Sequence, residues 1–274
     1  MLVDFSLRPP YKSLAKMGVH SETSVRANAA DMNMKPSEAA LQHSTDLLVK
    51  EMEEAEIVHG VSHGRSKDGG LTQDLKDLMN QYPGKFTGFP GINLTNMANA
   101  IEETRVCLAE GFLGVMLEPG NNMPPIYPDD PALYPIYELC RQQGAHVLYT
   151  LSGQAGPDIS YSNPVHVDRV ARDFPTVKFI VRHAFWPWNL EACGVAKKRP
   201  NLYLCPDVYW GMPGYMDWVD AANTYLSDRL LFGTAFPVAP LKPMVELFRK
   251  LPFRDGVREK VEYLNGAKLL NLPA

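Results

Sequence analysis

The sequence has no long hydrophobic run and no cluster of basic residues. No apolar stretch approaches the roughly 18 residues that a membrane-spanning helix needs, and Asp4 interrupts the segment where a signal peptide would need an apolar core. Lysine and arginine are scattered along a chain of net charge -4, which argues against the basic surface that nucleic acids require. We therefore expect a cytoplasmic protein without a membrane or nucleic-acid partner.

Cysteine is scarce, and the four cysteines form no Cys-x-x-Cys pair. They lie far apart in apolar or helical segments, at Cys107, Cys140, Cys193 and Cys205. This distribution excludes a disulfide framework and favours reduced, buried thiols over metal ligands or nucleophiles. Apolar residues make up 45% of the 274 residues, which is enough to bury a large core, so disorder over most of the chain is excluded as well.

What the sequence does contain is a regular alternation of short apolar segments with segments of helical periodicity. The apolar segments predict strands at 2–7, 57–62, 85–89, 112–117, 146–150, 177–181, 202–205 and 230–232. The intervening patterns predict helices at 35–55, 72–82, 96–110, 131–143, 164–173, 189–198, 215–226, 241–251 and 257–270. Residues 11–34 show little periodicity and predict a long loop with at most a helical turn, and such a loop in a compact domain is usually a lid or a disordered segment.

Eight strands that are apolar throughout, each followed by a helix, indicate a parallel sheet buried on both faces. We therefore predict an α/β fold: one (β/α)8 TIM-barrel domain over residues 1–274, with an extra C-terminal helix and a long first βα loop. An open doubly wound sheet is the alternative. That fold normally has a glycine-rich turn after its first strand, where this chain has Arg8-Pro9-Pro10.

Several motifs, taken in their order and spacing, resemble the amidohydrolase-related family, the decarboxylase and lactonase branch of the amidohydrolase superfamily. They are the segments 111–115, 129–137, 173–183, 229–237 and 263–267. The resemblance implies a TIM barrel, a hydrolase or carboxy-lyase activity and a homodimer. The segment Phe232-Gly233-Thr234-Ala235-Phe236-Pro237 is the most informative, because the family has a catalytic aspartate where this chain has Ala235.

The resemblance also implies a divalent metal at the C-terminal mouth of the barrel. The family holds it with Asp-x-His-x-His on strand one, a histidine on strand five, often one on strand six, and the aspartate on strand eight. In this chain the corresponding residues are Asp4, Ser6, Arg8, Thr150, His183 and Ala235. A guanidinium cannot ligate a cation and would repel one, so we expect no metal cofactor at the family position.

A relocated metal site is the alternative, and its ligands would come from His183, Glu118, Asp207 or His63. Nothing in the spacing of these residues requires one.

Residues that follow the strands of a barrel meet at its mouth, which identifies candidate site residues. The candidate catalytic residues are His183, whose ordinary pKa lies near neutrality, together with Glu118 and Asp207. The candidate substrate-binding residues are Ser6, Arg8, His63, Arg65, Asn93, Thr150 and Tyr209. Because arginine pairs bidentately with carboxylates, we expect a small carboxylate substrate, held by Arg8 and Arg65.

Several of these residues also have a structural interpretation. His183 can be a relic, Glu118 a solvated loop acid, and His63 and Arg65 part of a solvated basic loop. Arg8 can be a counter-ion of Glu118 or Asp207. The histidines assigned no role are His20, His43, His59, His146 and His166.

Two functions follow. The first is a metal-independent hydrolase, similar to a lactonase, or a decarboxylase that acts on a small carboxylated ring compound. The second is a non-catalytic barrel that has lost its metal site and binds a small acid or a protein partner.

Overall fold

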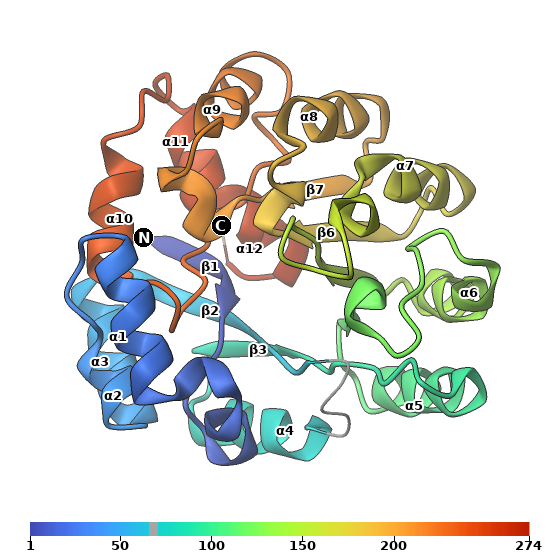
Figure 1. Ribbon diagram of the computed structural model, residues 1–274, viewed down its shortest axis with the longest axis horizontal. Helices are drawn as coiled ribbons and strands as arrows, with labels where there is room; N and C mark the ends of the chain where they lie inside the picture. Colours follow the sequence, from blue (N-terminus) through green and yellow to red (C-terminus); the bar gives the residue numbers. More distant parts are fainter. Residues whose placement is uncertain (66–70, 274) are drawn as a thin grey trace.

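The computed structural model describes residues 1–65 and 71–273 and shows parallel strands surrounded by helices (Figure 1). The strands are β1 (Leu2–Leu7), β2 (Ile57–His63), β3 (Phe86–Phe89), β4 (Gly114–Leu117), β5 (His146–Thr150), β6 (Lys178–Arg182) and β7 (Leu202–Cys205). Each coincides with a predicted strand apart from small differences at the ends. The apolar segments therefore became strands because both of their faces are buried.

The strands follow one another around the barrel in the order of the chain. β1, β2 and β3 form one parallel sheet, and β4, β5, β6 and β7 form another. Isolated parallel bridges join Gly91 to Met116, Leu204 to Leu230 and Leu7 to Phe236. These bridges connect the two sheets on both sides, as the predicted TIM barrel requires.

The eighth predicted strand, 230–232, contributes isolated bridges instead of a continuous ladder. The amide of Leu231 donates to Leu204 on β7 (2.9 Å), and the amide of Phe5 on β1 donates to Phe232 (3.0 Å). A Cβ on Gly233 would lie 2.6 Å from Cys205 Sγ, and Ala235 has a φ of 62°. The segment lies where we predicted it, but the close approach at Gly233 and the left-handed Ala235 interrupt regular pairing.

Helices cover the outside of the barrel. After the first strand come α2 (Glu38–Leu41) and α3 (Thr45–Glu54). The following helices are α4 (Thr72–Gln81), α5 (Met97–Ala109), α6 (Tyr134–Gln143), α7 (Pro164–Asp173), α8 (Asn189–Lys198), α9 (Tyr215–Thr224) and α10 (Leu241–Arg249). The C-terminal segment contains α11 (Val257–Glu259), the π-helical turn η9 (Lys260–Leu264) and α12 (Asn265–Leu270).

Two predicted helices are divided in the structure. The helix predicted at 35–55 is broken between α2 and α3, where His43 has a φ of 49° and Ser44 caps α3 by accepting from the Leu47 amide (3.2 Å). The helix predicted at 257–270 changes to a π-helical turn in its middle. In both places the apolar periodicity continues across the break, so the sequence pattern alone did not show it.

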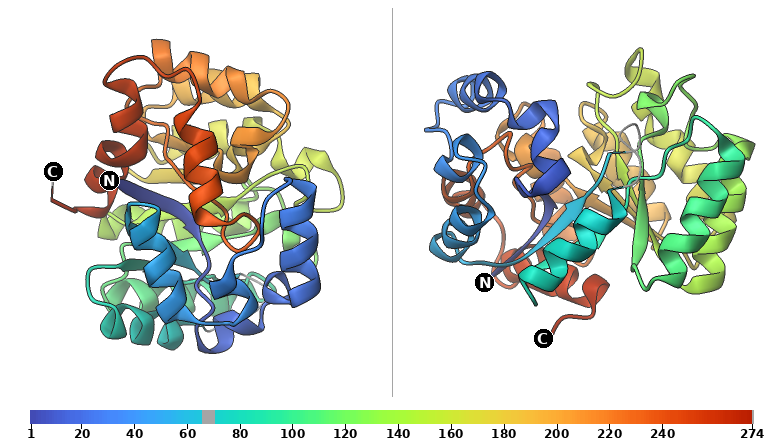
Figure 2. Two further views of the ribbon diagram at one scale, coloured as in Figure 1. Left: turned by 90° about the vertical axis from the view of Figure 1, so that its left-hand side faces the viewer. Right: turned by 90° about the horizontal axis from the view of Figure 1, so that it is seen from below.

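The prediction of a long loop at 11–34 was wrong. This segment contains the 3-10 helices η1 (Lys12–Lys16) and η2 (Gly18–His20), followed by α1 (Glu22–Asp31). In α1 only Val25 and Ala29 are buried, which explains why the sequence shows so little apolar periodicity there. Figure 2 shows the segment at the end of the barrel opposite the two chain termini.

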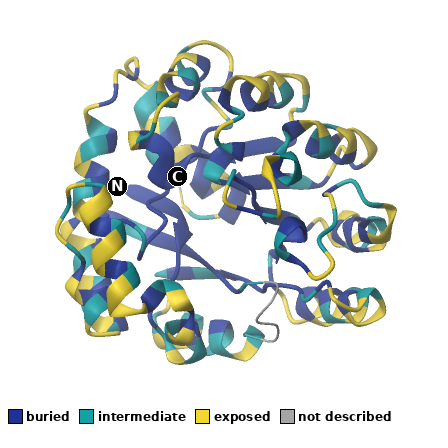
Figure 3. Cartoon of the chain, viewed as in Figure 1, coloured by how far each residue is buried: buried dark blue, intermediate teal, exposed yellow. Residues whose placement is uncertain are grey.

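The core has two parts, and the strands separate them. Inside the barrel lies a cluster that includes Phe5, Phe89, Met116, Leu148 and Ile180, and the larger cluster lies between the strands and the helices. Figure 3 shows the strands buried and the exposed residues on the outer faces of the helices. The four cysteines are free and buried, as predicted. In the described part of the chain, no helix has the length and apolar character needed to cross a membrane.

Candidate active site

The C-terminal ends of β1, β6 and β7 bring three predicted site residues into contact. Ser6 Oγ donates a hydrogen bond to Asp207 (2.8 Å), and His183 Nδ1 donates to the same carboxylate, also at 2.8 Å. Ser6 and Asp207 are fully buried, whereas the His183 side chain is 14% exposed. Asp207 therefore anchors both a hydroxyl and an imidazole at the mouth of the barrel.

Arg182 is the residue at the centre of this cluster that the sequence analysis missed. It is fully buried, and it donates to Ser6 Oγ from Nε (3.0 Å) and Nη2 (2.7 Å) and to Thr150 Oγ1 from Nη1 (3.0 Å). Thr150 is its direct neighbour in the β5–β6 ladder. The sequence held a signal for this residue, because Arg182 lies two positions after the interior residue Ile180 and so faces the barrel interior.

His183 occupies a sharp bend between β6 and α8. His183, Ala184 and Phe185 all have positive φ, at 66°, 42° and 64°. Such conformations are strained for residues other than glycine and occur most often at functional sites. The bend places the His183 ring near the ring of Tyr209 in a T-shaped arrangement (5.4 Å between centroids), and Tyr209 also stacks on Trp186 (4.9 Å).

Burial lowers the pKa of His183, an effect that the Asp207 carboxylate partly offsets. The ring is therefore neutral at neutral pH. Because an ionised carboxylate only accepts hydrogen bonds, Nδ1 carries the single proton and Nε2 is left with a lone pair. A neutral imidazole with an oriented Nε2 can accept a proton from water or from a substrate.

Arg8 is buried close enough to His183 for its charge to act on that ring, and it has no ion-pair partner in the described residues. It is 6% exposed, and within residues 1–65 and 71–273 its Nε has no hydrogen-bond partner and its guanidinium no carboxylate in ion-pair contact. Burial and the nearby charge of Arg182 lower the pKa of Arg8 to about 9, so the group is still a cation at neutral pH. The counter-ion interpretation required contact with Glu118 or Asp207, which the structure does not show in the described residues.

Arg65 and Glu118 form an ion pair, with Arg65 Nε 3.3 Å from Glu118 Oε2. Glu118 is 1% exposed, so its interpretation as a solvated loop acid was wrong. The Arg65 side chain is 28% exposed. Because the two charges offset each other, Arg65 is less suited than Arg8 to bind an anion.

His63 is also fully buried, so its interpretation as part of a solvated loop was wrong. Its Nδ1 lies 3.2 Å from the Gly64 carbonyl, and its Nε2 has no partner among the described residues. Burial, together with the charges of Arg182 and Arg8, keeps the pKa of His63 well below its ordinary value. A neutral His63 can therefore offer one free ring nitrogen to a ligand.

Asn93 is the predicted site residue that the structure does not join to this cluster. Its side-chain oxygen accepts from the Thr95 amide (2.9 Å), which closes a turn after β3.

Asp4 links β1 to the eighth segment. Its carboxylate accepts hydrogen bonds from Ser6 N (2.9 Å), Thr234 N (3.1 Å) and Thr234 Oγ1 (2.6 Å). Burial raises the pKa of Asp4 to about 7.

The donor set that residues 1–65 and 71–273 place at the mouth does not fit a divalent cation. Among the described residues, no three His, Cys, Asp or Glu side chains lie close enough together to hold a metal ion. The Arg182 guanidinium contacts both Ser6 and Thr150, at two positions where the family resemblance implies metal ligands. A fixed positive charge at this place disfavours a cation.

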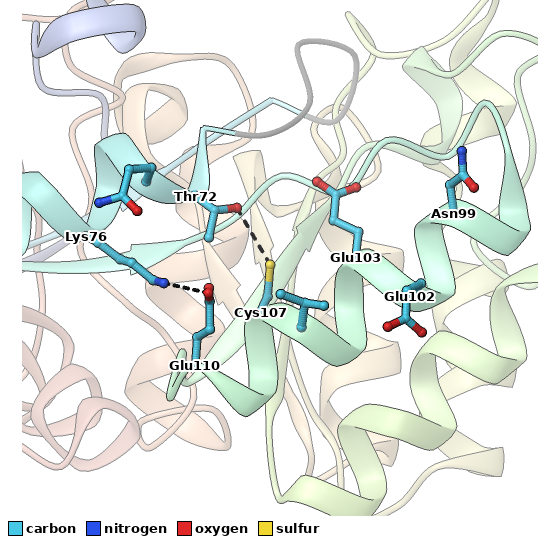
Figure 4. Close-up of a pocket in the computed structure, with 9 residues that line it drawn as sticks. Thr72, Lys76, Asn99, Glu102, Glu103, Cys107 and Glu110 are labelled. Carbon is cyan, nitrogen blue, oxygen red and sulfur yellow. Dashed lines mark hydrogen bonds and ion pairs between the residues drawn. The ribbon is translucent and has the colours of Figure 1, made fainter.

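A second hollow lies outside the mouth, between α4 and α5 (Figure 4). Its volume is about 530 Å³, and its polar groups contact one another: Lys76 pairs with Glu110 (2.7 Å), and Thr72 Oγ1 lies 3.7 Å from Cys107 Sγ. None of the predicted site residues lines it. This hollow therefore contributes nothing to the predicted site.

Comparisons with known proteins agree with the fold. A family model described as Amidohydrolase matches residues 20–272. The structure of an uncharacterised TIM-barrel protein from Bordetella bronchiseptica is 38% identical, with 98% of both chains covered and a TM-score of 0.93. The 5-carboxyvanillate decarboxylase of Sphingomonas paucimobilis is 14% identical over 99% of this chain and 98% of that one, with a TM-score of 0.68, a likeness of fold alone.

A curated relative, the 2-amino-3-carboxymuconate-6-semialdehyde decarboxylase of Dictyostelium discoideum, is 31% identical over 79 residues. The match covers 28% of this chain and 21% of that protein. The predicted TIM barrel and the predicted amidohydrolase family are confirmed. Since the family model spans residues 20–272, this chain belongs to the amidohydrolase family.

Proposed function

We propose that this protein is a metal-independent hydrolase or decarboxylase of small carboxylated ring compounds, in which Arg8 binds the carboxylate and His183 moves the proton. The observation that carries the proposal is the 2.8 Å hydrogen bond from His183 Nδ1 to Asp207, beside the buried and unpaired cation Arg8. The match to a decarboxylase whose name contains a carboxylated compound supports the same substrate class.

The proton transfer follows from the tautomer of His183. Its Nε2 accepts a proton from water as the water oxygen attacks a lactone carbonyl, and it returns that proton to the leaving oxygen. In a decarboxylation His183 Nε2 first takes up a proton from solvent water; the carbon–carboxylate bond then breaks, carbon dioxide leaves, and the electron pair left on the ring carbon takes that proton from Nε2. In both reactions Asp207 orients the imidazole and stabilises its cationic form.

The proposal of a carboxylate on the substrate rests on the charges at the mouth. Arg65 is paired with Glu118, and Arg182 is hydrogen-bonded to Ser6 and Thr150 beside Asp207. Among residues 1–65 and 71–273, Arg8 is the mouth cation that has no partner, and a buried charge without a partner costs several kcal/mol. A carboxylate ligand offsets this cost by pairing with the Arg8 guanidinium.

Metal independence is supported by the same charges. The buried cations Arg8 and Arg182 lie near the positions where the family resemblance implies metal ligands, which supports a mouth without a metal. No step of the proposed chemistry passes through a metal, because a neutral His183 can activate water without one.

The experiment is a screen of lactones and aromatic carboxylates with protein treated with a chelator. For a compound that is turned over, His183→Asn should lower kcat about 10²-fold or more, and Arg8→Ala should mainly raise KM. The matched control is His166→Asn, because His166 Nδ1 also contacts a carboxylate, Asp129 at 2.6 Å, away from the mouth. Full turnover by His183→Asn would refute the role of His183, and binding without any turnover would favour the non-catalytic barrel.

We also propose that the protein is cytoplasmic and forms a homodimer. Light scattering coupled to size-exclusion chromatography measures the oligomeric state directly, because a monomer has a mass of 30.6 kDa and a dimer twice that mass.

A further inference from the structure

His20 is a fully buried imidazole whose ring makes no hydrogen bond within the described residues. A neutral imidazole has one donor and one acceptor nitrogen. Leaving a buried polar atom unpaired costs roughly 1–3 kcal/mol. The hydrogen bonds of His20 are made by its backbone instead. Its amide donates to the Met17 carbonyl (2.9 Å), and its carbonyl accepts from His43 Nε2 (2.8 Å). The structure therefore holds the His20 backbone in place and leaves both ring nitrogens without a partner among the described residues.

The segment that carries His20 is fastened at the mouth end of the barrel. Tyr11 donates to Gln81 (2.9 Å) and the Ser13 amide donates to Asp74 (3.0 Å), which ties the start of the segment to α4. Leu14 is fully buried in the core, so the segment cannot swing away freely. Figure 2 shows it at the end of the barrel opposite the termini, which is the end where the strands finish.

His20 is close enough to Arg8 to be affected by its charge. Burial, followed by the charges of Arg8 and His43, lowers the pKa of His20 to about 3. His63 is likewise within range of the Arg8 charge. Among the described residues, three buried groups at this end of the barrel have no hydrogen-bond partner: Arg8 Nε, His63 Nε2 and the ring of His20. One of them is a cation and two are neutral.

We infer that His20 is a specificity-determining residue, which binds a neutral oxygen group, a hydroxyl or a carbonyl, on the ring compound whose carboxylate Arg8 holds. This inference rests on the proposed function. A neutral imidazole suits a neutral oxygen, because it can donate to a carbonyl or accept from a hydroxyl without a change of charge. A site built to pair with such a group rejects compounds that lack it, since its own polar atoms then remain unpaired.

The test compares benzoate with the three monohydroxybenzoates by isothermal titration calorimetry. At least one hydroxybenzoate should bind the wild type roughly 5- to 10-fold more tightly than benzoate, the effect of one hydrogen bond. His20→Ala and His20→Asn should lose this preference while their affinity for benzoate stays the same. His146→Asn is the matched control, because His146 is another mostly buried imidazole with an unpartnered Nδ1, at the start of β5 and away from the mouth.

The outcomes separate the inference from the function on which it rests. If both His20 variants keep the preference, or lose affinity for all four compounds equally, His20 does not determine specificity. If Arg8→Ala binds benzoate as well as the wild type does, or if the wild type binds none of the four compounds, the proposed function fails and the inference fails with it. Thermal melting of each variant identifies a loss that is due only to unfolding.

Discussion

Arg182 and Ser6, which lie 176 residues apart in the sequence, are joined by two hydrogen bonds of 3.0 and 2.7 Å. Together with the bond from Ser6 to Asp207 (2.8 Å), they connect the ends of β1, β6 and β7 through one buried hydroxyl. The arrangement places a permanent cation and an anion on either side of that hydroxyl. The stability and the chemistry of the mouth both depend on it.

Removal of the Arg182 guanidinium should destabilise the protein strongly. Arg182→Met keeps most of the side-chain volume but leaves the charge of Asp207 without its buried cation, so we expect a loss of roughly 3–5 kcal/mol in the free energy of unfolding. Urea denaturation measures the loss. Arg169→Met is the matched control, since that arginine pairs with Asp129 while 51% exposed and should change stability by less than about 1 kcal/mol. Equal effects of the two substitutions would contradict the assignment.

Loss of the Asp207 charge should impair proton transfer without removing the imidazole. In Asp207→Asn the amide can donate to His183 Nδ1, which favours the tautomer with the proton on Nε2 and so removes the base. We expect kcat to fall about 10²-fold or more, measured on a compound that the screen identifies. Asp129→Asn changes the matching pair at His166 and should leave kcat unaltered. A variant with wild-type kcat would show that the tautomer does not matter.

The stability of an Asp4→Asn variant relative to the wild type should rise with pH. Burial raises the pKa of Asp4 from 3.8 to about 7, so between these values the folded protein keeps a proton that the unfolded chain has lost. This group therefore makes the wild type less stable as the pH increases through that range. The variant lacks this titration. We therefore expect its free energy of unfolding to rise by roughly 2–4 kcal/mol relative to that of the wild type between about pH 4 and pH 8.

Urea unfolding at several pH values tests this expectation. Asp158→Asn should show the opposite trend, because hydrogen bonds from Ser160 lower the pKa of Asp158. Parallel stability curves for Asp4→Asn and the wild type would show that the titration is not coupled to folding.

Removal of metal should change neither folding nor turnover. We expect the same thermal midpoint and the same rate before and after treatment with EDTA, because positively charged side chains occupy the surroundings in which a cation would sit. Elemental analysis by mass spectrometry should find far less than one equivalent of zinc or manganese. A full equivalent of metal whose removal abolishes turnover would refute metal independence.

An added methyl group on Gly233 should weaken the eighth segment. The new Cβ would lie 2.6 Å from Cys205 Sγ and 3.0 Å from Ser6 Cβ, so we expect a destabilisation of roughly 1–3 kcal/mol in urea. Gly194→Ala is the control, since that position in α8 has no atom within 4 Å of the added carbon and should gain up to about 1 kcal/mol. The same effect at both positions would mean that the close approach at Gly233 is unimportant.

The sequence predicted the elements whose limits are set by local signals. α7 has the predicted bounds because Pro164 begins it and Asn163 caps it by accepting from the Val165 amide (3.0 Å). α1 escaped prediction because only two of its residues are buried. Its position depends on contacts made elsewhere in the segment, which no local pattern encodes.

The same distinction holds for the site. Positions after strands predicted Ser6, His183 and Asp207, because parallel strands finish at one end of a barrel. The sequence did not show which of them are paired, since hydrogen bonds between residues far apart in the chain depend on the completed fold. His20 was left without a role for this reason, and Arg182 was overlooked.

The hydroxyl of Ser6 has no bonding capacity left. Its proton goes to Asp207, and both of its lone pairs receive hydrogen bonds from Arg182. Ser6 therefore cannot attack a carbonyl, and no acyl-serine intermediate forms at this position. Fluorophosphonate reagents, which label activated serines, should leave Ser6 unmodified.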